Sequence, residues 1–183
     1  TLSSINMVFD ILFPVYTLRA GMSFTLVGSL SGIKMVLAAM VRPFSGALMA
    51  RINPIRLNVG SLLGLGAGTM LIPVVGMGFG LTAVIALLGA TFGSISTTSA
   101  TLVVKDESNP QLVSRRISYY NTCLTLGQTI SPWLIGLVAD KIEVTTALMV
   151  VPVFFLGIFG VGSFAIPRLV SRFDKTEMRT SLI

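Results

Sequence analysis

The 48 residues "LNVGSLLGLGAGTMLIPVVGMGFGLTAVIALLGATFGSISTTSATLVV" (57–104) contain no charged side chain. A membrane-spanning helix needs about 20 consecutive, predominantly apolar residues, so this stretch is long enough for two spans. The glycine-rich segment "GMGFG" (76–80) is the natural position for a turn between them. The stretch therefore predicts two antiparallel transmembrane helices, at about 57–75 and 80–104.

The rest of the chain has the same character. It has 183 residues, of which 53% are hydrophobic and 11% are charged, and its mean hydropathy is +0.88. An ordinary soluble domain carries about 25% charged residues. The apolar runs are long and continuous, whereas the strands of a membrane β-barrel alternate apolar and polar residues. We therefore expect an all-α integral membrane protein.

Charged residues divide the chain into six expected spans, which form one bundle at 1–167. The spans lie at about 1–18, 24–50, 57–75, 80–104, 116–139 and 144–167, and a polar tail follows at 168–183. The first span is short, because its clearly apolar part begins only at Ile5. We expect it to be the end of a helix whose start precedes this chain.

The basic residues predict the orientation in the membrane. If the tail is cytoplasmic and the spans alternate, the inside segments carry nine basic residues: Arg51, Arg56, Lys105, Arg115, Arg116, Arg168, Arg172, Lys175 and Arg179. The outside loops carry only Arg19 and Lys141. This bias follows the positive-inside rule and predicts a cytoplasmic C-terminus. We expect an integral plasma membrane protein, as in the inner membrane of a bacterium. Since the net charge of +6 lies at the ends of apolar runs, it does not indicate nucleic-acid binding.

A short motif occurs twice in the chain. "GALMARI" (46–52) and "GLVADKI" (136–142) share a glycine, a basic residue five positions later and a final isoleucine. Three spans separate the two copies, and three is odd, so the copies face opposite sides of the membrane. An inverted-topology repeat of three spans plus three has this arrangement. We therefore expect a 3+3 inverted repeat.

The loop around the first copy, "RPFSGALMARINPIR" (42–56), resembles the loop between the eighth and ninth spans of the major facilitator superfamily. That family's motif there is a glycine, three residues, Asp-Arg, one residue, a second glycine and then basic residues. Gly46 and Arg51 match the motif, whereas Ala50 stands at its acidic position. Asn53 replaces the second glycine, and Pro54 replaces a basic residue.

Two further segments resemble the same family, in the same order. "FPVYTLRAGMSFTLVGSL" (13–30) looks like the transition from its seventh to its eighth span, and "NTCLTLGQTISPWLIGLVADK" (121–141) looks like its eleventh. The resemblance covers nearly the whole chain. It implies six transmembrane helices that form the C-terminal half of a twelve-helix transporter, with the beginning of the first helix missing.

The resemblance also implies a function. Members of this family move small solutes by rocking two six-span halves around a site at the midplane, and proton coupling is plausible. The implied partners are a small-molecule substrate, the lipid bilayer, and either the missing N-terminal half or a second copy; no cofactor is implied. Ala50 puts in doubt the role of this loop in cytoplasmic closure. Arg51 and Arg56 remain candidates for topology anchors and for contacts with the partner half.

Asp10 and Lys34 are the sharpest candidates for a functional site. Each lies twelve positions from Met22, at the turn between the first two spans, so both are roughly 18 Å below it. Ionisable groups at that depth are costly and usually face each other or a cavity. The sequence thus predicts an ion pair, or a site for substrate or proton coupling. Alternatively, Asp10 lies near water, and Lys34 reaches a cavity without having a role.

Two other spans carry polar stripes. Thr91, Ser94 and Thr98 follow one face of the fourth span, where hydroxyl groups can bind a ligand or support helix packing; packing is the favoured interpretation. Asn121, Thr125 and Gln128 share a face of the fifth span. Because an amide in hydrocarbon needs a partner, we expect this face to point into the bundle, for ligand contact or for structural hydrogen bonds.

Small residues favour close helix contacts. Glycine pairs at GxxxG spacing allow helix backbones to approach. The third and fourth spans carry them at Gly60, Gly64, Gly68, Gly89 and Gly93. We interpret these glycines as packing positions within the bundle, with dimerisation as the alternative. Gly46 is interpreted in the same way.

Other classes of function are less compatible with the sequence. The chain has no histidine, no GxGD or HExxH pattern and a single cysteine, Cys123, which argues against an intramembrane enzyme and predicts no metal site. A membrane sensor or assembly factor on the same fold remains the alternative to a transporter. Stabilisation by a ligand would favour the transporter, since a ligand stabilises the state that it binds.

Overall fold

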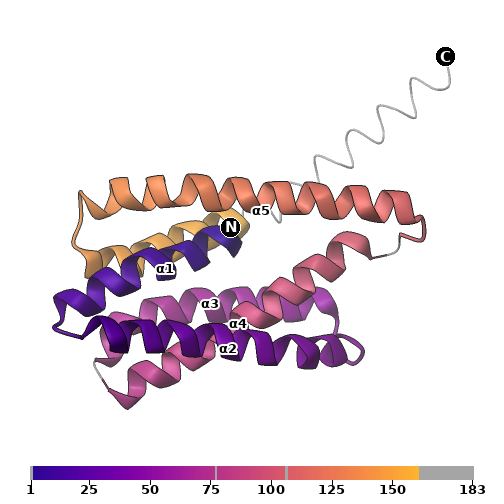
Figure 1. Ribbon diagram of the computed structural model, residues 1–183. Helices are drawn as coiled ribbons and strands as arrows, with labels where there is room; N and C mark the ends of the chain where they lie inside the picture. Colours follow the sequence, from indigo (N-terminus) through magenta and orange to yellow (C-terminus); the bar gives the residue numbers. More distant parts are fainter. Residues whose placement is uncertain (1, 77, 106, 161–183) are drawn as a thin grey trace.

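The computed structural model describes residues 2–76, 78–105 and 107–160, and these residues form helices and no strand (Figure 1). The helices are α1 (Leu2–Arg19), α2 (Phe24–Met49), α3 (Pro54–Val75), α4 (Phe79–Val104), α5 (Pro110–Ala139) and a last described helix, Val144–Gly160. Four of them, α2 to α5, are long and apolar enough to cross a membrane. The expected all-helical membrane architecture is therefore confirmed. The expected tail at 168–183 lies outside the described residues.

The charge-free stretch forms two helices with a glycine turn, as its sequence predicted. Helix α3 ends at Val75 and α4 begins at Phe79. Between them, Gly76 has a φ of 70° and Gly78 a φ of 148°. Residues that have a side chain rarely adopt these backbone angles, so glycine suits both positions.

Side-chain caps define where three helices begin. The Ser23 hydroxyl accepts a hydrogen bond from the Leu26 N–H, and the Asn53 and Asn109 side chains cap α3 and α5 in a similar way. A proline follows each asparagine, at the first helical position, where its missing N–H has no cost. Helix α5 consequently begins at Pro110, six residues before the expected span at 116–139.

Helix α4 packs against α2 through two glycines. A Cβ at Gly89 would lie 2.5 Å from the carbonyl oxygen of Lys34, and a Cβ at Gly93 would collide with the backbone of Ala38. Only hydrogen atoms fit between these backbones. The predicted packing role of both glycines is confirmed, and α2 and α4 are held at close approach over this part of their length.

Two glycines of α3 pack against side chains of α4 in a related way. A Cβ at Gly64 would lie 2.8 Å from the methyl group of Thr91, and a Cβ at Gly68 would lie 2.7 Å from Leu88. Gly60 and Gly46 differ, since a Cβ at either position would meet no atom within 4 Å. The interpretation of Gly60 and Gly46 as close-packing positions is therefore wrong. The shared spacing shows that glycines lie on one helix face, but not that a neighbour covers this face.

Helix α1 contributes as many side chains to the core as α4 does, and α5 lies at the edge of the core. Five side chains of α1 are buried in the main apolar cluster: Ile5, Val8, Phe9, Leu12 and Phe13. Helix α5 buries only Ser131 and Ile135. It runs along one side of the bundle, beside α1 and the helix Val144–Gly160, as Figure 1 shows.

Candidate functional site

Asp10 and Lys34 form an ion pair within the bundle. The Lys34 ammonium nitrogen lies 2.7 Å from Oδ1 of Asp10 and donates a hydrogen bond to it. The contact joins α1 to α2, and the spacing of both residues from the turn at Met22 predicted it. Gly21, with a φ of 87°, allows that turn to be tight. The contact itself is confirmed, while its functional role stays a prediction.

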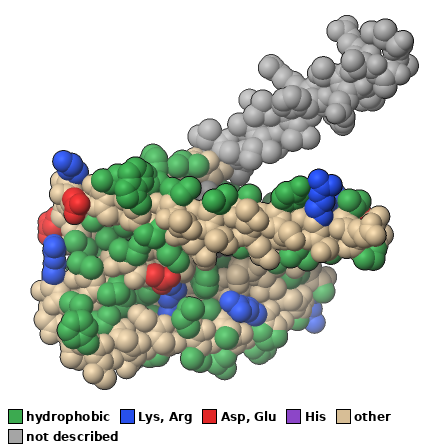
Figure 2. All heavy atoms as spheres, turned by 45° about the horizontal axis from the view of Figure 1, so that its top comes forward, with side chains coloured by type: hydrophobic (Ala, Val, Ile, Leu, Met, Phe, Trp, Pro, Cys, Tyr) green, Lys and Arg blue, Asp and Glu red, His purple; other side chains and the backbone are tan. Residues whose placement is uncertain are grey.

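The two partners differ strongly in exposure. The Lys34 side chain is 1% exposed, whereas the Asp10 side chain is 40% exposed. Figure 2 shows most charged groups near the ends of the molecule and one adjoining acidic and basic pair in the middle of the visible face. A ligand that approaches the pair therefore meets the carboxylate of Asp10 before the ammonium group of Lys34.

Aromatic rings enclose the Lys34 ammonium group. Its nitrogen lies 4.0 Å from the ring centroid of Phe9 and 5.5 Å from that of Phe92 in α4. Phe9 in turn stacks on Phe13, with 4.6 Å between ring centroids. The negative faces of aromatic rings attract a cation, so these contacts stabilise a charge that would otherwise be poorly solvated.

Asn6 completes the site, although the sequence did not single it out. Its Nδ2 donates a hydrogen bond of 2.6 Å to Oδ2 of Asp10, one helical turn away. Its Oδ1 is buried and has no hydrogen-bond partner among the described residues. The i, i+4 spacing of Asn6 and Asp10 was the available signal, because it puts both side chains on the same face of a helix.

The polar stripe of α4 is used for contacts between helices. The Ser94 hydroxyl lies 2.9 Å from the hydroxyl of Ser45 in α2. The Thr98 hydroxyl accepts a hydrogen bond from Asn58 of α3. The Thr91 hydroxyl donates to carbonyl groups of its own helix, and its methyl group faces Gly64. The described geometry therefore agrees with the favoured packing interpretation of this stripe.

The polar stripe of α5 lies on the surface of the described bundle. Asn121, Thr125 and Gln128 are all exposed, so this face does not point into the bundle that the described helices form, contrary to the expectation. Thr125 donates a hydrogen bond to the backbone carbonyl of Asn121 within its own helix. The pattern of polar residues indicated a shared face correctly, but the rotation of α5 turns that face away from its neighbours.

The loop between α2 and α3 is separate from the ion pair. Arg51 and Arg56 are exposed on either side of the Asn53 cap, and Gly46 is exposed on the last turns of α2. These positions fit a role at the membrane surface. They make no contact with Asp10 or Lys34 in the part of the chain that the structure describes.

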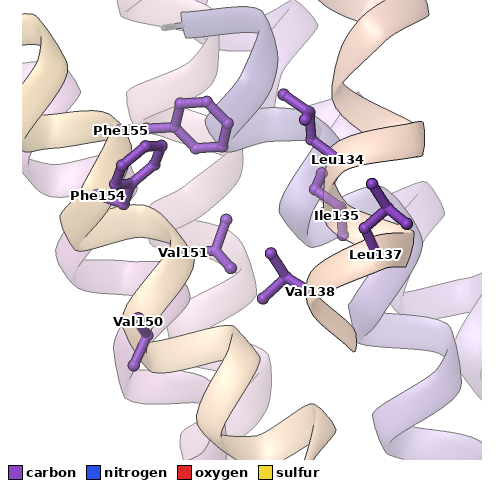
Figure 3. Close-up of a pocket in the computed structure, with 8 residues that line it drawn as sticks. All are labelled: Leu134, Ile135, Leu137, Val138, Val150, Val151, Phe154 and Phe155. Atoms are coloured by element: carbon purple, nitrogen blue, oxygen red, sulfur yellow. The ribbon is translucent and has the colours of Figure 1, made fainter. Parts of the chain in front are cut away.

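An apolar cavity of about 400 Å³ lies between α5 and the helix Val144–Gly160. Figure 3 shows its side chains from the two helices, which include Leu134 and Val138 on one side and Val151 and Phe155 on the other. All eight lining side chains are hydrocarbon. The cavity offers no hydrogen bond or charge, so the ion pair is the stronger candidate for recognition of a polar solute.

Comparison with known families agrees with a bundle of apolar, membrane-spanning helices. A family model described as Major Facilitator Superfamily matches residues 1–180. No curated protein and no solved structure matches the chain. The family match and the apolar helices support an integral membrane protein that acts in transmembrane transport. The chain belongs to the Major Facilitator Superfamily.

Proposed function

We propose that this chain is the C-terminal, six-span half of a twelve-span transporter that moves a small solute by alternating access. The Asp10–Lys34 pair is its site for substrate or for coupling. The observation that carries the proposal is a 2.7 Å ion pair between two helices of a membrane protein, in which Lys34 is buried and Asp10 is accessible. Ionisable groups within a membrane are costly, and they usually mark the path of a substrate or an ion.

The contacts between helices support an inverted repeat of three helices plus three. Such a repeat relates α1 to α4, α2 to α5, and α3 to the helix Val144–Gly160. The packing of α2 on α4 then corresponds to that of α5 on α1, and both contacts occur. The contact of α1 with α2 corresponds to that of α4 with α5, which also occurs. The pairing of helices therefore fits the repeat that the two seven-residue motifs predicted.

The exposed stripe of α5 supports a missing partner. Asn121 and Gln128 carry amide groups, which cannot face hydrocarbon without a large cost in free energy. In the complete transporter this face is covered by the N-terminal half or a second copy, or it lines the water-filled path between them. An orientation with a cytoplasmic C-terminus is supported by the positive-inside bias.

Transport by the full-length protein in proteoliposomes tests the proposal. After a substrate has been found by thermal-shift screening, we expect Asp10→Asn and Lys34→Met each to reduce its uptake to about a tenth or less, since each removes one partner of a costly intramembrane pair. Asp140→Asn, in the loop after α5, is the matched control and should retain uptake. Normal uptake by both variants of the pair would refute the site. A folded protein that no ligand stabilises would instead favour a sensor or assembly factor.

A further inference from the structure

We propose that the apolar cavity between α5 and the helix Val144–Gly160 binds one acyl chain of a membrane phospholipid, and that the loop between these two helices holds the zwitterionic headgroup of the same lipid. The inference goes beyond the proposed function, since this cavity shares no residue with the Asp10–Lys34 pair. The ligand is a component of the bilayer and not a transported solute.

The cavity has a buried floor and an exposed rim. Ile135 and Val151 lie on the floor and are buried, whereas Leu137, Val150 and Phe154 are exposed at the rim. Figure 3 shows the lining side chains of the two helices on either side of the space between them. An empty space of this kind leaves the atoms around it without van der Waals partners. A flexible hydrocarbon chain that enters past the exposed rim supplies these partners.

The rim lies on the side of α5 that faces away from its polar stripe. Leu134 and Leu137 each lie nine positions after a residue of that stripe, Thr125 and Gln128 respectively. Nine residues make about two and a half helical turns, so the rim is on the opposite side of the helix. The amide of Gln128 cannot face hydrocarbon without a large cost in free energy. The opposite side, where the cavity opens, is therefore the side that faces lipid.

The depth of the cavity matches one leaflet of a bilayer. On α5 its lining extends from Val138, two residues before Asp140, to Leu134, six residues before it. On the second helix it extends to Phe155, eleven residues after Val144. At 1.5 Å per residue, the cavity reaches from about 3 Å to about 16 Å below the loop. One leaflet supplies about 15 Å of the hydrocarbon core, so an acyl chain that begins at the loop fills the cavity to its end.

The loop above the cavity carries charges of both signs. Asp140, Lys141 and Glu143 are exposed, and none of them makes an ion pair in the part of the chain that the structure describes. The ammonium group of Lys141 is suited to a phosphate, and the carboxylate of Glu143 is suited to a primary ammonium group. Phosphatidylethanolamine carries both of these groups. Phosphatidylglycerol carries only the phosphate and would meet two carboxylates, so charge complementarity favours phosphatidylethanolamine.

Photolabelling of the full-length protein tests the site. Phosphatidylethanolamine with a diazirine group near the middle of one acyl chain is added to the protein in mild detergent at low concentration. After illumination, mass spectrometry of peptides locates the labelled residues. We expect the labels to gather on the lining residues within 134–138 and 150–155. Equal labelling of other exposed apolar side chains, such as Met35 and Phe44 of α2, would refute the site, because an ordinary lipid shell has no such preference.

Two valines of the second helix form a matched pair for this experiment. Val150 and Val153 are both 51% exposed, but only Val150 lines the cavity. Val150→Trp puts a ring into the space of the acyl chain and should reduce labelling of α5 about tenfold. Val153→Trp adds the same ring outside the cavity and should leave this labelling unchanged. Equal labelling of α5 in the two variants would refute the inference. Leu137→Trp repeats the test from the opposite wall, should Val150→Trp fail to fold.

Competition between unlabelled lipids tests the headgroup. Phosphatidylethanolamine should displace the photoreactive lipid at a lower concentration than phosphatidylglycerol with the same acyl chains. Equal competition by the two lipids would refute the assignment of the headgroup. A cavity that takes no label, while Val150→Cys forms a disulfide between two copies of the protein, would identify a protein occupant and refute the lipid site.

Discussion

Helices α4 and α5 carry similar polar stripes that meet different surroundings. Thr91, Ser94 and Thr98 of α4 lie between neighbours, and two of their hydroxyl groups make hydrogen bonds to α2 or α3. The α5 stripe, which includes Asn121 and Gln128, lies on the surface of the described bundle. A polar stripe thus identifies a face that avoids lipid, but only packing shows whether this chain or something else covers it.

The largest expected effect on stability comes from adding a methyl group at a closely packed glycine. Gly93→Ala would push a methyl group into the backbone of Ala38 and force α4 away from α2, so we expect it to reduce the free energy of unfolding by about 2–3 kcal/mol. Gly136→Ala in α5 is the matched control. It meets no atom within 4 Å and should leave stability unchanged or slightly higher. Thermal unfolding in detergent measures both, and equal effects would show that the contact between α2 and α4 is not tight.

The next largest loss of stability is expected when an amide that joins α3 to α4 is removed. Asn58 donates hydrogen bonds to the hydroxyl groups of Thr98 and Ser99, at 2.9 and 2.7 Å. Asn58→Leu should therefore cost about 1–2 kcal/mol, near the upper end for hydrogen bonds between membrane helices. Gln128→Leu, on the exposed face of α5, should cost little in the same unfolding measurement. A larger loss from Gln128→Leu would contradict the described position of α5.

A smaller effect separates the hydroxyl groups of the two stripes. Ser94→Ala removes the 2.9 Å contact with Ser45 and should cost about 0.6 kcal/mol, the average for such bonds. Thr125→Ala removes only a bond to the α5 backbone, so its stability should change by less than about 0.3 kcal/mol. Unfolding in denaturant, with both variants measured in parallel, compares the two losses of stability. A larger loss of stability in Thr125→Ala than in Ser94→Ala would contradict the difference between the two stripes.

The smallest effect on stability is expected where the effect on transport is large. The double variant Asn121→Leu, Gln128→Leu removes both amides from the exposed face of α5 and should unfold like the unchanged chain. If this face lines the transport path or contacts the partner half, uptake by the full-length protein should fall clearly. Normal uptake together with normal stability would show that the stripe has neither role.

Much of the fold could be predicted because charges and turns are strong signals in a membrane protein. The turn at 76–80 and the contact between Asp10 and Lys34 both follow from counting residues along helices. The rotation of a helix about its axis is less accessible, because it depends on side chains of helices elsewhere in the chain. For this reason two predictions differ from the described bundle. The α5 stripe was expected to face other helices but is exposed, and Gly46 was expected to pack closely but has open space beside it. The contribution of Asn6 was missed because its one turn of separation from Asp10 is common in any helix.

The buried position of Lys34 has a consequence for how the protein enters the membrane during synthesis. A lysine at the centre of a helix costs about 2.5–3.5 kcal/mol during insertion by the translocon. Helix α4, which later packs on α2 beside this lysine, has not yet been made when α2 emerges from the ribosome. Asp10 has been made, and it lies on the preceding helix. Helices α1 and α2 therefore have a reason to insert together as a hairpin, with their opposite charges already paired.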